Sequence, residues 1–321
     1  MKIACFGENC VDINYIDGVI MPGGNCVNAA IYCSQLGHDA AYVGTVADDR
    51  YGQLILASLD RYGVDRSMVK IAHGETGRSA CRLVNGDRTL TMENGGGVIY
   101  TDPIVVDDAY LAYFRKFDLV HANYWAYLDP ELKKIKAHTD VPICYDFSQA
   151  WDEQKIRSAS EFADYILFSE RKDLDLQANL AMLRMSVERY GVKMGIMTFG
   201  IDGAYVYNGR ELFFKEPYNA DGGAVDTTGC GDSWISGFIT SYMENMLRLK
   251  NHSRVATEQP LLNMEEKKIR RSFLTAENEE DYERAAIRMA MCVGNMRARS
   301  TCQIQGAYGC GITIEEFGRQ S

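Results

Sequence analysis

The sequence lacks several features that define common classes of protein. Basic residues are outnumbered, because 34 Lys and Arg oppose 44 Asp and Glu, and the formal net charge is −10. This deficit argues against a nucleic-acid partner, since phosphate backbones attract basic surfaces. No apolar run approaches the roughly 20 residues of a membrane span, and the N-terminus lacks the apolar core of a cleavable signal. We therefore expect a soluble, cytoplasmic protein with neither nucleic-acid nor membrane partners.

Two classes of cofactor site are also missing from the sequence pattern. The ten cysteines include no C-x-x-C pair, so we interpret them as reduced core residues rather than zinc or redox ligands. No predicted strand is followed by a G-x-G-x-x-G turn, which is the fingerprint of dinucleotide binding. The sequence therefore argues against a zinc protein and against an NAD-dependent enzyme.

Strand-like and helical patterns alternate from the N-terminus onwards. Strands are predicted at residues 2–7, 40–49, 117–125, 142–148, 163–169 and 193–200, and helices at residues 26–36 and 51–64. This alternation is typical of a mostly parallel sheet covered by helices. Because apolar residues make up 46% of the chain, we expect one ordered α/β domain that spans residues 1–321.

Three stretches interrupt the alternation. Residues 76–91 predict a hairpin around an Asn-Gly-Asp turn at residues 85–87, and residues 203–217 predict another. An inserted hairpin often forms a lid or a homodimer contact, although a decorative edge hairpin is the alternative. Residues 247–283 are strongly charged and weakly periodic, which predicts a solvated insertion between two helices.

The run DTTGCGD at residues 226–232 is the strongest local motif. Glycines on either side of Cys230 let consecutive N–H groups converge before the N-terminus of a predicted helix, where an anion binds well. The carboxylate of Asp232 stands at the edge of this turn, in position to take a proton from an attacking hydroxyl. The alternative is that Asp232 only caps the helix.

A second glycine-rich turn, PGGNCVN at residues 22–28, precedes the first predicted helix. Its glycines permit close approach of the backbone to a ligand, and Asn28 both donates and accepts hydrogen bonds. Asp12 follows the first strand and offers a carboxylate for two neighbouring hydroxyls. Each feature alone is also compatible with an ordinary tight turn.

Together these motifs resemble those of the ribokinase-like (PfkB) carbohydrate kinase family. The N-terminal glycine–asparagine motif stands at residues 23–37, and the C-terminal DTxGAGD motif at residues 226–232. Between them, TFGIDG at residues 198–203 is similar to the T-x-G-x-x-G nucleotide-binding turn of the family. The resemblance spans nearly the whole chain. It implies a three-layer sandwich around a mostly parallel sheet, with a small β lid from about residues 12–22 and 76–96.

The resemblance also implies a role for each matching residue. Asp232 would be the base that activates a primary hydroxyl of a sugar-like substrate, with ATP as the phosphoryl donor. The other assignments are Gly229, Cys230 and Gly231 for the anion site, Asp12, Gly24 and Asn28 for the sugar, Thr198, Gly200 and Gly203 for ATP, Asn295 for a wall of the adenine pocket, and Asp226 and Thr228 for a monovalent cation such as potassium. For Asn295, a role as a buried polar group of its helix is the alternative.

Two positions depart from the family pattern. Cys230 stands where the family usually has Ala, which leaves the backbone N–H groups unaffected. The N-x-x-E motif that helps to organise magnesium is replaced by SERKD at residues 169–173, so Glu170 and Asp173 are both candidates for its role. Magnesium itself is expected, because the charges of the β- and γ-phosphates must be neutralised during transfer.

Within the family, four stretches resemble the fructosamine kinases, which are bacterial enzymes that phosphorylate fructoselysine at its 6-hydroxyl. They are GENCVDIN (7–14), GGNCVNAAIYC (23–33), VHANYW (120–125) and YDFSQAWD (145–152). This resemblance implies a pocket that extends beyond the sugar, with an acidic group near the amine. The candidates for its outer wall are Glu93, Asp152, Tyr124, Trp125 and Trp151. For the two tryptophans, burial in the core or in an interface is the alternative.

Two other hypotheses stay open at this point. The first is a kinase for another ketose, ribose or a nucleoside. The second is a non-catalytic relative that binds sugar or nucleotide for regulation or assembly. The intact Asp232 and its neighbouring glycines argue against the second hypothesis, whereas the altered magnesium motif favours it.

Overall fold

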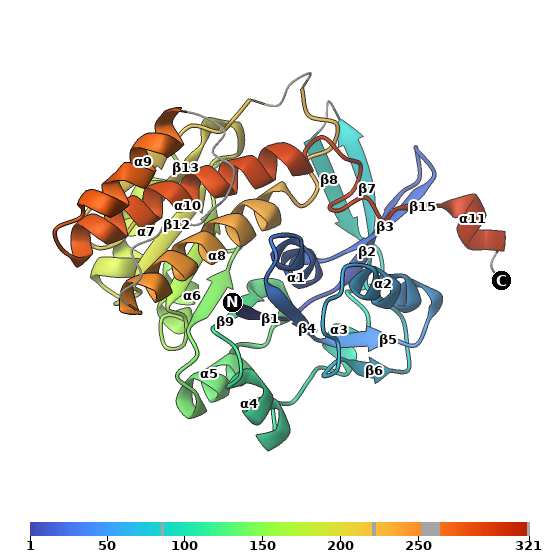
Figure 1. Cartoon of the computed structure of the whole chain (residues 1–321). Helices are drawn as coiled ribbons and strands as arrows, with labels where there is room; N and C mark the ends of the chain where they lie inside the picture. The colour runs from blue at the N-terminus through green and yellow to red at the C-terminus, as the bar shows by residue number, and fades with distance from the viewer. Residues whose placement is uncertain (85–86, 220–222, 252–263, 320–321) are drawn as a thin grey trace.

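The computed structural model describes residues 1–84, 87–219, 223–251 and 264–319. In these residues an eight-stranded sheet runs in the order β14-β13-β12-β11-β10-β9-β1-β4 (Figure 1). Its strands are β1 (Lys2–Phe6), β4 (Asp39–Val43), β9 (Leu119–Asn123), β10 (Ile143–Asp146), β11 (Tyr165–Ser169), β12 (Met194–Thr198), β13 (Ala204–Tyr207) and β14 (Leu212–Lys215). The strands from β4 to β12 are parallel, and β13 and β14 add an antiparallel hairpin. This hairpin is the one that residues 203–217 predicted.

Helices cover both faces of the sheet and enclose two apolar cores. One core holds side chains of α1 (Asn25–Gln35), α2 (Arg50–Arg61), α8 (Cys230–Lys250), α9 (Met264–Thr275) and α10 (Glu279–Thr301). The other core holds side chains of α4 (Asp108–Phe114), α5 (Asp129–His138), α6 (Glu153–Ala159) and α7 (Leu176–Glu188). In Figure 1, α8 and α10 lie side by side over the sheet face that borders the first of these cores. Helices on both faces explain why the parallel strands are nearly continuous apolar runs.

The first strand, β1, contributes side chains to both cores. Successive side chains of a strand point to opposite faces, so Ile3 and Cys5 enter one core while Ala4 and Phe6 enter the other. All four are fully buried. The resulting three layers confirm the predicted fold class, a mostly parallel sheet between helices with a small second sheet.

The second sheet has the strand order β15-β3-β2-β7-β8. It consists of β2 (Cys10–Asn14), β3 (Val19–Gly23), β7 (Arg78–Val84), β8 (Asp87–Met92) and β15 (Ile312–Thr313). The stretches 12–22 and 76–96 thus lie together in it, and residues 85–86 of the expected turn lie outside the described residues. The remaining elements are the pair β5 (Thr45–Ala47) and β6 (Lys70–Ala72), α3 (Val98–Thr101), α11 (Ile314–Arg319), and the 3-10 turns η1 (Tyr124–Ala126) and η2 (Gly200–Asp202).

Two local predictions differ from the structure. Residues 40–49 form two strands instead of one, because β4 pairs with β1 whereas β5 pairs with β6. Pro22 and Gly23 belong to β3 rather than to a turn, and the chain changes direction at Gly24. Apolar patterning indicates that a segment is extended, but it does not indicate which partner strand the segment selects.

The charged stretch 247–283 is not entirely a solvated connection. Its residues 252–263 lie outside the described residues, but residues 264–275 form α9. Ile269 and Phe273, four positions apart and therefore on one helix face, are buried in the core, where Phe273 contacts the ring of Tyr282. Because charged residues lie between these two positions, the sequence pattern did not reveal this short apolar helix face. In the part of the chain that the structure describes, no helix is both long and apolar enough to cross a membrane.

Candidate active site

Polar residues gather at the carboxyl ends of the parallel strands. Asn123 ends β9, Asp146 ends β10 and Thr198 ends β12, while Glu8 and Glu170 follow β1 and β11. These strands are neighbours in the sheet, and ligands of open α/β sheets bind in the crevice outside such strand ends. The site therefore extends along one edge of the main sheet.

The glycine-rich turn at residues 226–232 begins α8, and its helix cap is Gly229. This residue has φ = +73°, and an added Cβ would lie 2.5 Å from the Tyr32 hydroxyl and 2.7 Å from the Ala307 Cβ. Only glycine fits there without strain. Asp232 stands three residues further on, in the first turn of the helix, and no side chain of the described residues caps α8. The alternative that Asp232 is the helix cap is therefore wrong.

The carboxylate of Asp232 is held by two amides from the first turn of α1. Asn25 donates from Nδ2 to Oδ1 of Asp232 at 2.8 Å, and Asn28 donates from Nδ2 to Oδ2 at 2.6 Å. Both asparagines are buried. More than 200 residues thus separate groups that meet in space, and the structure brings the predicted Asn28 and Asp232 together.

Asn25 also binds three further groups that the sequence analysis did not single out. Its Nδ2 donates to Asp146 Oδ2 at 2.8 Å, its backbone N–H donates to Glu8 Oε1 at 3.3 Å, and His121 Nε2 lies 2.9 Å from its Oδ1. Each of these groups lies in or just after a buried strand, so the available signal was a polar residue at the end of an apolar run.

Burial sets the protonation of this cluster. The pKa of the Glu8 carboxyl is raised to about 7, mainly by desolvation and in part by the nearby charges of Asp232 and Asp12, against a hydrogen bond from the Asn25 backbone. Desolvation likewise raises the pKa of Asp146 to about 7, with the charge of Asp232 adding to the effect. Burial lowers the pKa of His121 to about 4. His121 is therefore neutral at pH 7, and Glu8 and Asp146 are partly protonated there.

The backbone is strained at two points beside this cluster. Among the described residues, Tyr127 (φ = +52°) and Ser148 (φ = +51°) are the non-glycine residues with positive φ. They follow β9 and β10, and the Ser148 N–H donates to Asp146 Oδ1 at 2.7 Å. Such conformations persist where surrounding contacts enforce them and are common at functional sites.

The predicted sugar-binding residues Asp12 and Gly24 lie in this region. Asp12 belongs to β2 and is 4% exposed. Gly24 has φ = +101°, and an added Cβ would lie 2.6 Å from the Asn9 Cα and 3.0 Å from the Cys10 N. The close approach that Gly24 permits is therefore to the backbone of the chain itself.

The predicted nucleotide-binding turn follows β12. Gly200 has open space around it in the described part of the chain, whereas an added Cβ on Gly203 would lie 2.5 Å from the Lys215 carbonyl oxygen of β14. Thr198, which precedes the turn, is half-buried. The turn is thus packed against β14 on one side and open on the other.

Asn295 lies deep in α10, where its polar atoms have partners within the protein. Its Oδ1 accepts from Trp234 Nε1 at 2.8 Å, and its Nδ2 donates to the Glu216 carbonyl at 2.6 Å. These contacts favour its role as a buried polar group that joins α8, α10 and the segment after β14.

The two magnesium candidates differ in their surroundings. The exposed carboxylate of Asp173 is bound by the guanidinium of Arg171 at 2.6 Å, which lowers its pKa. Glu170 lies at the carboxyl end of β11, and its backbone N–H donates to the Thr198 carbonyl at 2.9 Å. No cluster of three or more His, Cys, Asp or Glu able to hold a metal occurs in the described residues. Magnesium bound mainly by phosphates needs only one or two protein carboxylates, and Glu170 fits that requirement better than Asp173.

The monovalent-cation candidates lie under the turn before α8. Asp226 is fully buried, and its two carboxylate oxygens accept from the N–H groups of Thr228 and Gly306, both at 2.8 Å. The Thr228 hydroxyl is buried and has no hydrogen-bond partner among the residues that the structure describes. A buried oxygen that lacks a donor is compatible with a cation ligand.

The residues predicted for an outer wall separate into two groups. Trp151 is 2% exposed, contacts Phe168 edge-on and donates from Nε1 to the Ser169 carbonyl at 2.8 Å, so it is a core residue. The side chain of Asp152 caps α6. Trp125 is 39% exposed and Glu93 accepts from the exposed Tyr15 hydroxyl, while Tyr124 contacts the Trp125 ring.

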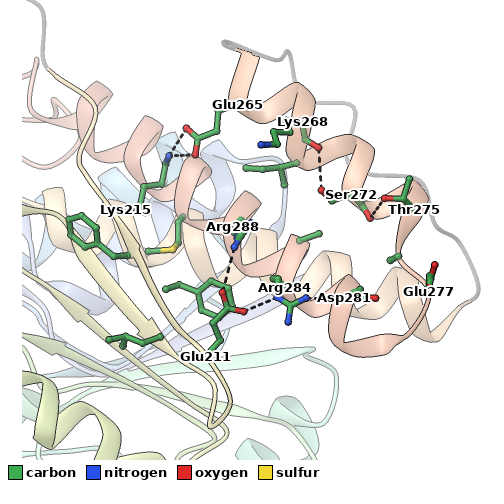
Figure 2. A pocket seen from close by; sticks show the side chains of 17 residues that line it. Glu211, Lys215, Glu265, Lys268, Ser272, Thr275, Glu277, Asp281, Arg284 and Arg288 are labelled. Atoms are coloured by element: carbon green, nitrogen blue, oxygen red, sulfur yellow. Dashed lines mark hydrogen bonds and ion pairs between the residues drawn. The ribbon is translucent and has the colours of Figure 1, made fainter.

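A cavity in the described part of the chain lies away from these residues, between β14, α9 and α10 (Figure 2). It has a volume of about 680 Å³, and its lining includes none of the predicted site residues. Many of its charged side chains are paired, as in Lys215 with Glu265 at 2.8 Å and Glu211 with Arg284 at 2.7 Å. The cavity is thus distinct from the cluster around Asp232.

Comparisons with known proteins agree with this geometry. The family model described as "pfkB family carbohydrate kinase" matches residues 6–258. The chain is 30% identical over 243 residues to fructosamine kinase FrlD of Bacillus subtilis, which covers 75% of this chain and 84% of that protein. It is 28% identical over 244 residues to fructoselysine 6-kinase of Escherichia coli, covering 76% and 90%.

A solved structure shows the same fold. The ribokinase of Giardia lamblia superposes with a TM-score of 0.70 at 18% identity, covering 100% of this chain and 98% of that one. The extent of the family match and the identity to its members lead to one conclusion: the chain belongs to the pfkB family of carbohydrate kinases.

Proposed function

We propose that this kinase transfers the γ-phosphoryl group of ATP to the 6-hydroxyl of fructoselysine or a related fructosamine, with Asp232 as the catalytic base. The observation that carries the proposal is the position of Asp232 in the first turn of α8, where amides of Asn25 and Asn28 hold its carboxylate. A carboxylate at a helix N-terminus stands beside a group of N–H donors that favours anions.

The reaction follows from this arrangement. Asp232 accepts the proton of the substrate hydroxyl while the oxygen of that hydroxyl forms a bond to the γ-phosphorus. The bond between the γ-phosphorus and the bridging oxygen breaks, and its electron pair leaves with ADP. The N–H groups of Gly229, Cys230 and Gly231 stabilise the charge on the transferred group. Magnesium, when bound, neutralises the β- and γ-phosphates, and Glu170 would hold it.

The remaining site residues are proposed to bind the two substrates. Asp12 and Asn28 hold the sugar, next to the backbone that Gly24 packs against. Thr198 and the turn at residues 200–203 line the ATP site. The substrate class rests on the relatives whose names are fructosamine kinase and fructoselysine 6-kinase. Trp125 and Glu93 are the exposed groups that would face the amine-bearing end of such a substrate.

Two finer proposals concern location and assembly. All ten cysteines are free thiols in the structure, which supports a cytoplasmic location. We also propose a homodimer formed through the small sheet, of which β8 is an edge strand. Light scattering of the purified chain tests this proposal, because a monomer mass at micromolar concentration would contradict it.

The experiment is a measurement of ADP formation with fructoselysine, other fructosamines, fructose, ribose and nucleosides. We expect the highest kcat/KM with a fructosamine, and phosphorus NMR of the product then shows a 6-phosphate. Asp232→Ala should lower kcat at least about 10³-fold, because it removes the base. Asp108→Ala, on the exposed first turn of α4, is the matched control and should retain full activity.

Three outcomes would separate the parts of this proposal. Preferred turnover of fructose, ribose or a nucleoside would keep the kinase but contradict the fructosamine. Full activity of Asp232→Ala would contradict the base assignment, and no turnover with measurable ATP binding would favour a regulatory relative.

A further inference from the structure

We propose that Asn25 is a positioning residue for phosphoryl transfer, and that His121 fixes the orientation of its amide. The proposal rests on the proposed function, in which Asp232 is the catalytic base. Asn25 and Asn28 are three positions apart in the first turn of α1, so their side chains lie on one helix face. Their amides bind the two different oxygens of Asp232, at 2.8 and 2.6 Å, and together they form a clamp on the carboxylate.

The clamp leaves the carboxylate able to act as a base. An ionised carboxylate has about four lone-pair sites on its two oxygens, and the two amides use one on each oxygen. The two amides of the clamp therefore do not by themselves exhaust the acceptor sites of the carboxylate. Because the Asn25 and Asn28 amides engage both oxygens, they oppose rotation of the carboxylate about its terminal bond.

The chemistry of the neighbours determines which way the Asn25 amide points. Its Nδ2 group has two hydrogens, and these match the carboxylate oxygens of Asp232 and Asp146, each 2.8 Å away. A flipped amide would place Oδ1 against both carboxylates, which is repulsive. Oδ1 therefore faces His121 Nε2 at 2.9 Å and must receive a hydrogen from it.

His121 is suited to this task because it is buried and uncharged. It is 2% exposed in the middle of β9, and burial lowers its pKa to about 4. A neutral imidazole carries one N–H, which the contact with Asn25 places on Nε2. His121 thus acts on Asp232 through its hydrogen bond to Asn25.

Asn25 also keeps two acids apart. Asp146 and Asp232 both receive hydrogens from the same nitrogen, so the amide stands between two carboxylates that would otherwise repel or share a proton. Without the amide, the carboxylate of Asp232 is expected to turn away from the position that a substrate hydroxyl needs. A displacement of about 1 Å in a catalytic group can cost about 10²-fold in rate.

The test compares Asn25→Ala, His121→Phe and His121→Gln in steady-state assays with ATP and fructoselysine, or with the best substrate of the panel. We expect Asn25→Ala to lower kcat about 30- to 100-fold, with both KM values within about threefold of wild type. His121→Phe should lower kcat about 5- to 10-fold. His121→Gln keeps an N–H near the Nε2 position and should stay within about twofold.

Thermal melting of each variant separates positioning from folding. His121→Phe and His121→Gln differ in whether the side chain can donate a hydrogen bond to Asn25, and their kcat values are compared where their melting temperatures are equal. Equal kcat values for His121→Phe and His121→Gln would overturn the role of His121. A wild-type kcat in Asn25→Ala, or a raised sugar KM at unchanged kcat, would overturn the clamp. Asp232→Ala in the same assay distinguishes the two proposals. If Asp232→Ala is active, the base assignment fails. If Asp232→Ala is inactive while Asn25→Ala keeps wild-type activity, only the clamp fails.

Discussion

The two glycine-rich helix starts of this kinase look alike in sequence and differ in structure. Gly24 caps α1 and Gly229 caps α8, and neither helix has a side-chain cap from the described residues. The start of α1 is closed by the protein, because Asn9 packs on Gly24 and Glu8 accepts from the Asn25 backbone N–H. In α8 the cap Gly229 is also packed closely, against Tyr32 and Ala307, but two residues further on an added Cβ on Gly231 would meet no described atom within 4 Å.

This difference shows that a glycine-rich turn before a helix has two distinct uses. At α1 the glycine lets two segments of the chain approach closely, and the helix presents Asn25 and Asn28 to the site through their side chains. At α8 the turn leaves room at a helix N-terminus, where an anionic ligand is favoured. The following predictions test the contrast, from the largest expected effect to the smallest.

Gly24→Ala should destabilise the fold by about 3–5 kcal/mol, since the new Cβ combines a glycine-specific backbone conformation with overlap against the Asn9 backbone. Gly37→Ala is the matched control, because Gly37 also has positive φ (+84°) but no described atom within 4 Å of an added Cβ. It should cost only about 1 kcal/mol. Urea unfolding measures both values, and equal losses would contradict the close packing at α1.

Gly231→Ala should lower kcat about 10²-fold, equivalent to about 2.7 kcal/mol of barrier, because its methyl group enters the space proposed for the phosphoryl group. Its melting temperature should not fall, since alanine favours a helix over glycine by about 1 kcal/mol. Gly318→Ala in α11, where an added Cβ would also meet no described atom within 4 Å, provides the control with unchanged activity. An unchanged kcat in Gly231→Ala would place the phosphoryl group elsewhere.

Asp146→Asn should flatten the pH dependence of stability between about pH 4 and 7. The raised pKa of Asp146, about 7 in the folded state, means that the folded protein binds more protons there than the unfolded chain does. The stability that Asp146 contributes therefore falls as pH rises through this window. Removing the carboxyl should remove about 2 kcal/mol of that fall, about half of an isolated shift, since Glu8 and Asp232 share the titration.

The measurement is urea unfolding of wild type and Asp146→Asn at several pH values, with the difference in slope as the readout. Parallel pH profiles for the two proteins would show that Asp146 is ionised normally. The absolute stability of the variant is a poor guide, because the introduced side-chain amide would bring its own hydrogens against the amide of Asn25.

His121→Gln should make the protein less sensitive to acid. The lowered pKa of His121, about 4 when folded, means that the unfolded chain takes up the proton first as pH falls. The stability that His121 contributes above pH 6.5 is therefore lost between about pH 6.5 and 4, and between pH 6.5 and 4.5 the variant should avoid about 2 kcal/mol of this loss. Urea unfolding at pH 6.5 and 4.5 gives the comparison, and an equal loss in both proteins would contradict it.

Sequence patterns predicted most of the fold because the strands and helices of the main sheet can be recognised from short stretches of sequence. The parallel strands are apolar runs, and β9, β10 and β11 are each followed directly by a helical element; this alternation admits few other arrangements. The division of residues 40–49 into two strands and the buried face of α9 escaped prediction, since both depend on partners distant in the chain.

The candidate site was predicted only in part, for the same reason. Asp232 and Asn28 stand in glycine-rich motifs that indicate chemistry by themselves. His121 and Asp146 are single polar residues in apolar strands, and their meaning appears only when β9 and β10 place them against α1. Trp151 was the converse case, an aromatic that looked available for a ligand and is buried in the core.

The sequence by itself determined the alternating architecture, the two glycine-rich helix starts and the presence of a carboxylate beside one of them. These are local properties, fixed by side-chain periodicity and backbone freedom. Only the tertiary structure decided that the α1 start is closed by the chain while the α8 start has space at Gly231, and that Asn25 joins Asp146, His121 and Asp232. Such contacts depend on packing between segments as far as 207 residues apart, which no local pattern encodes.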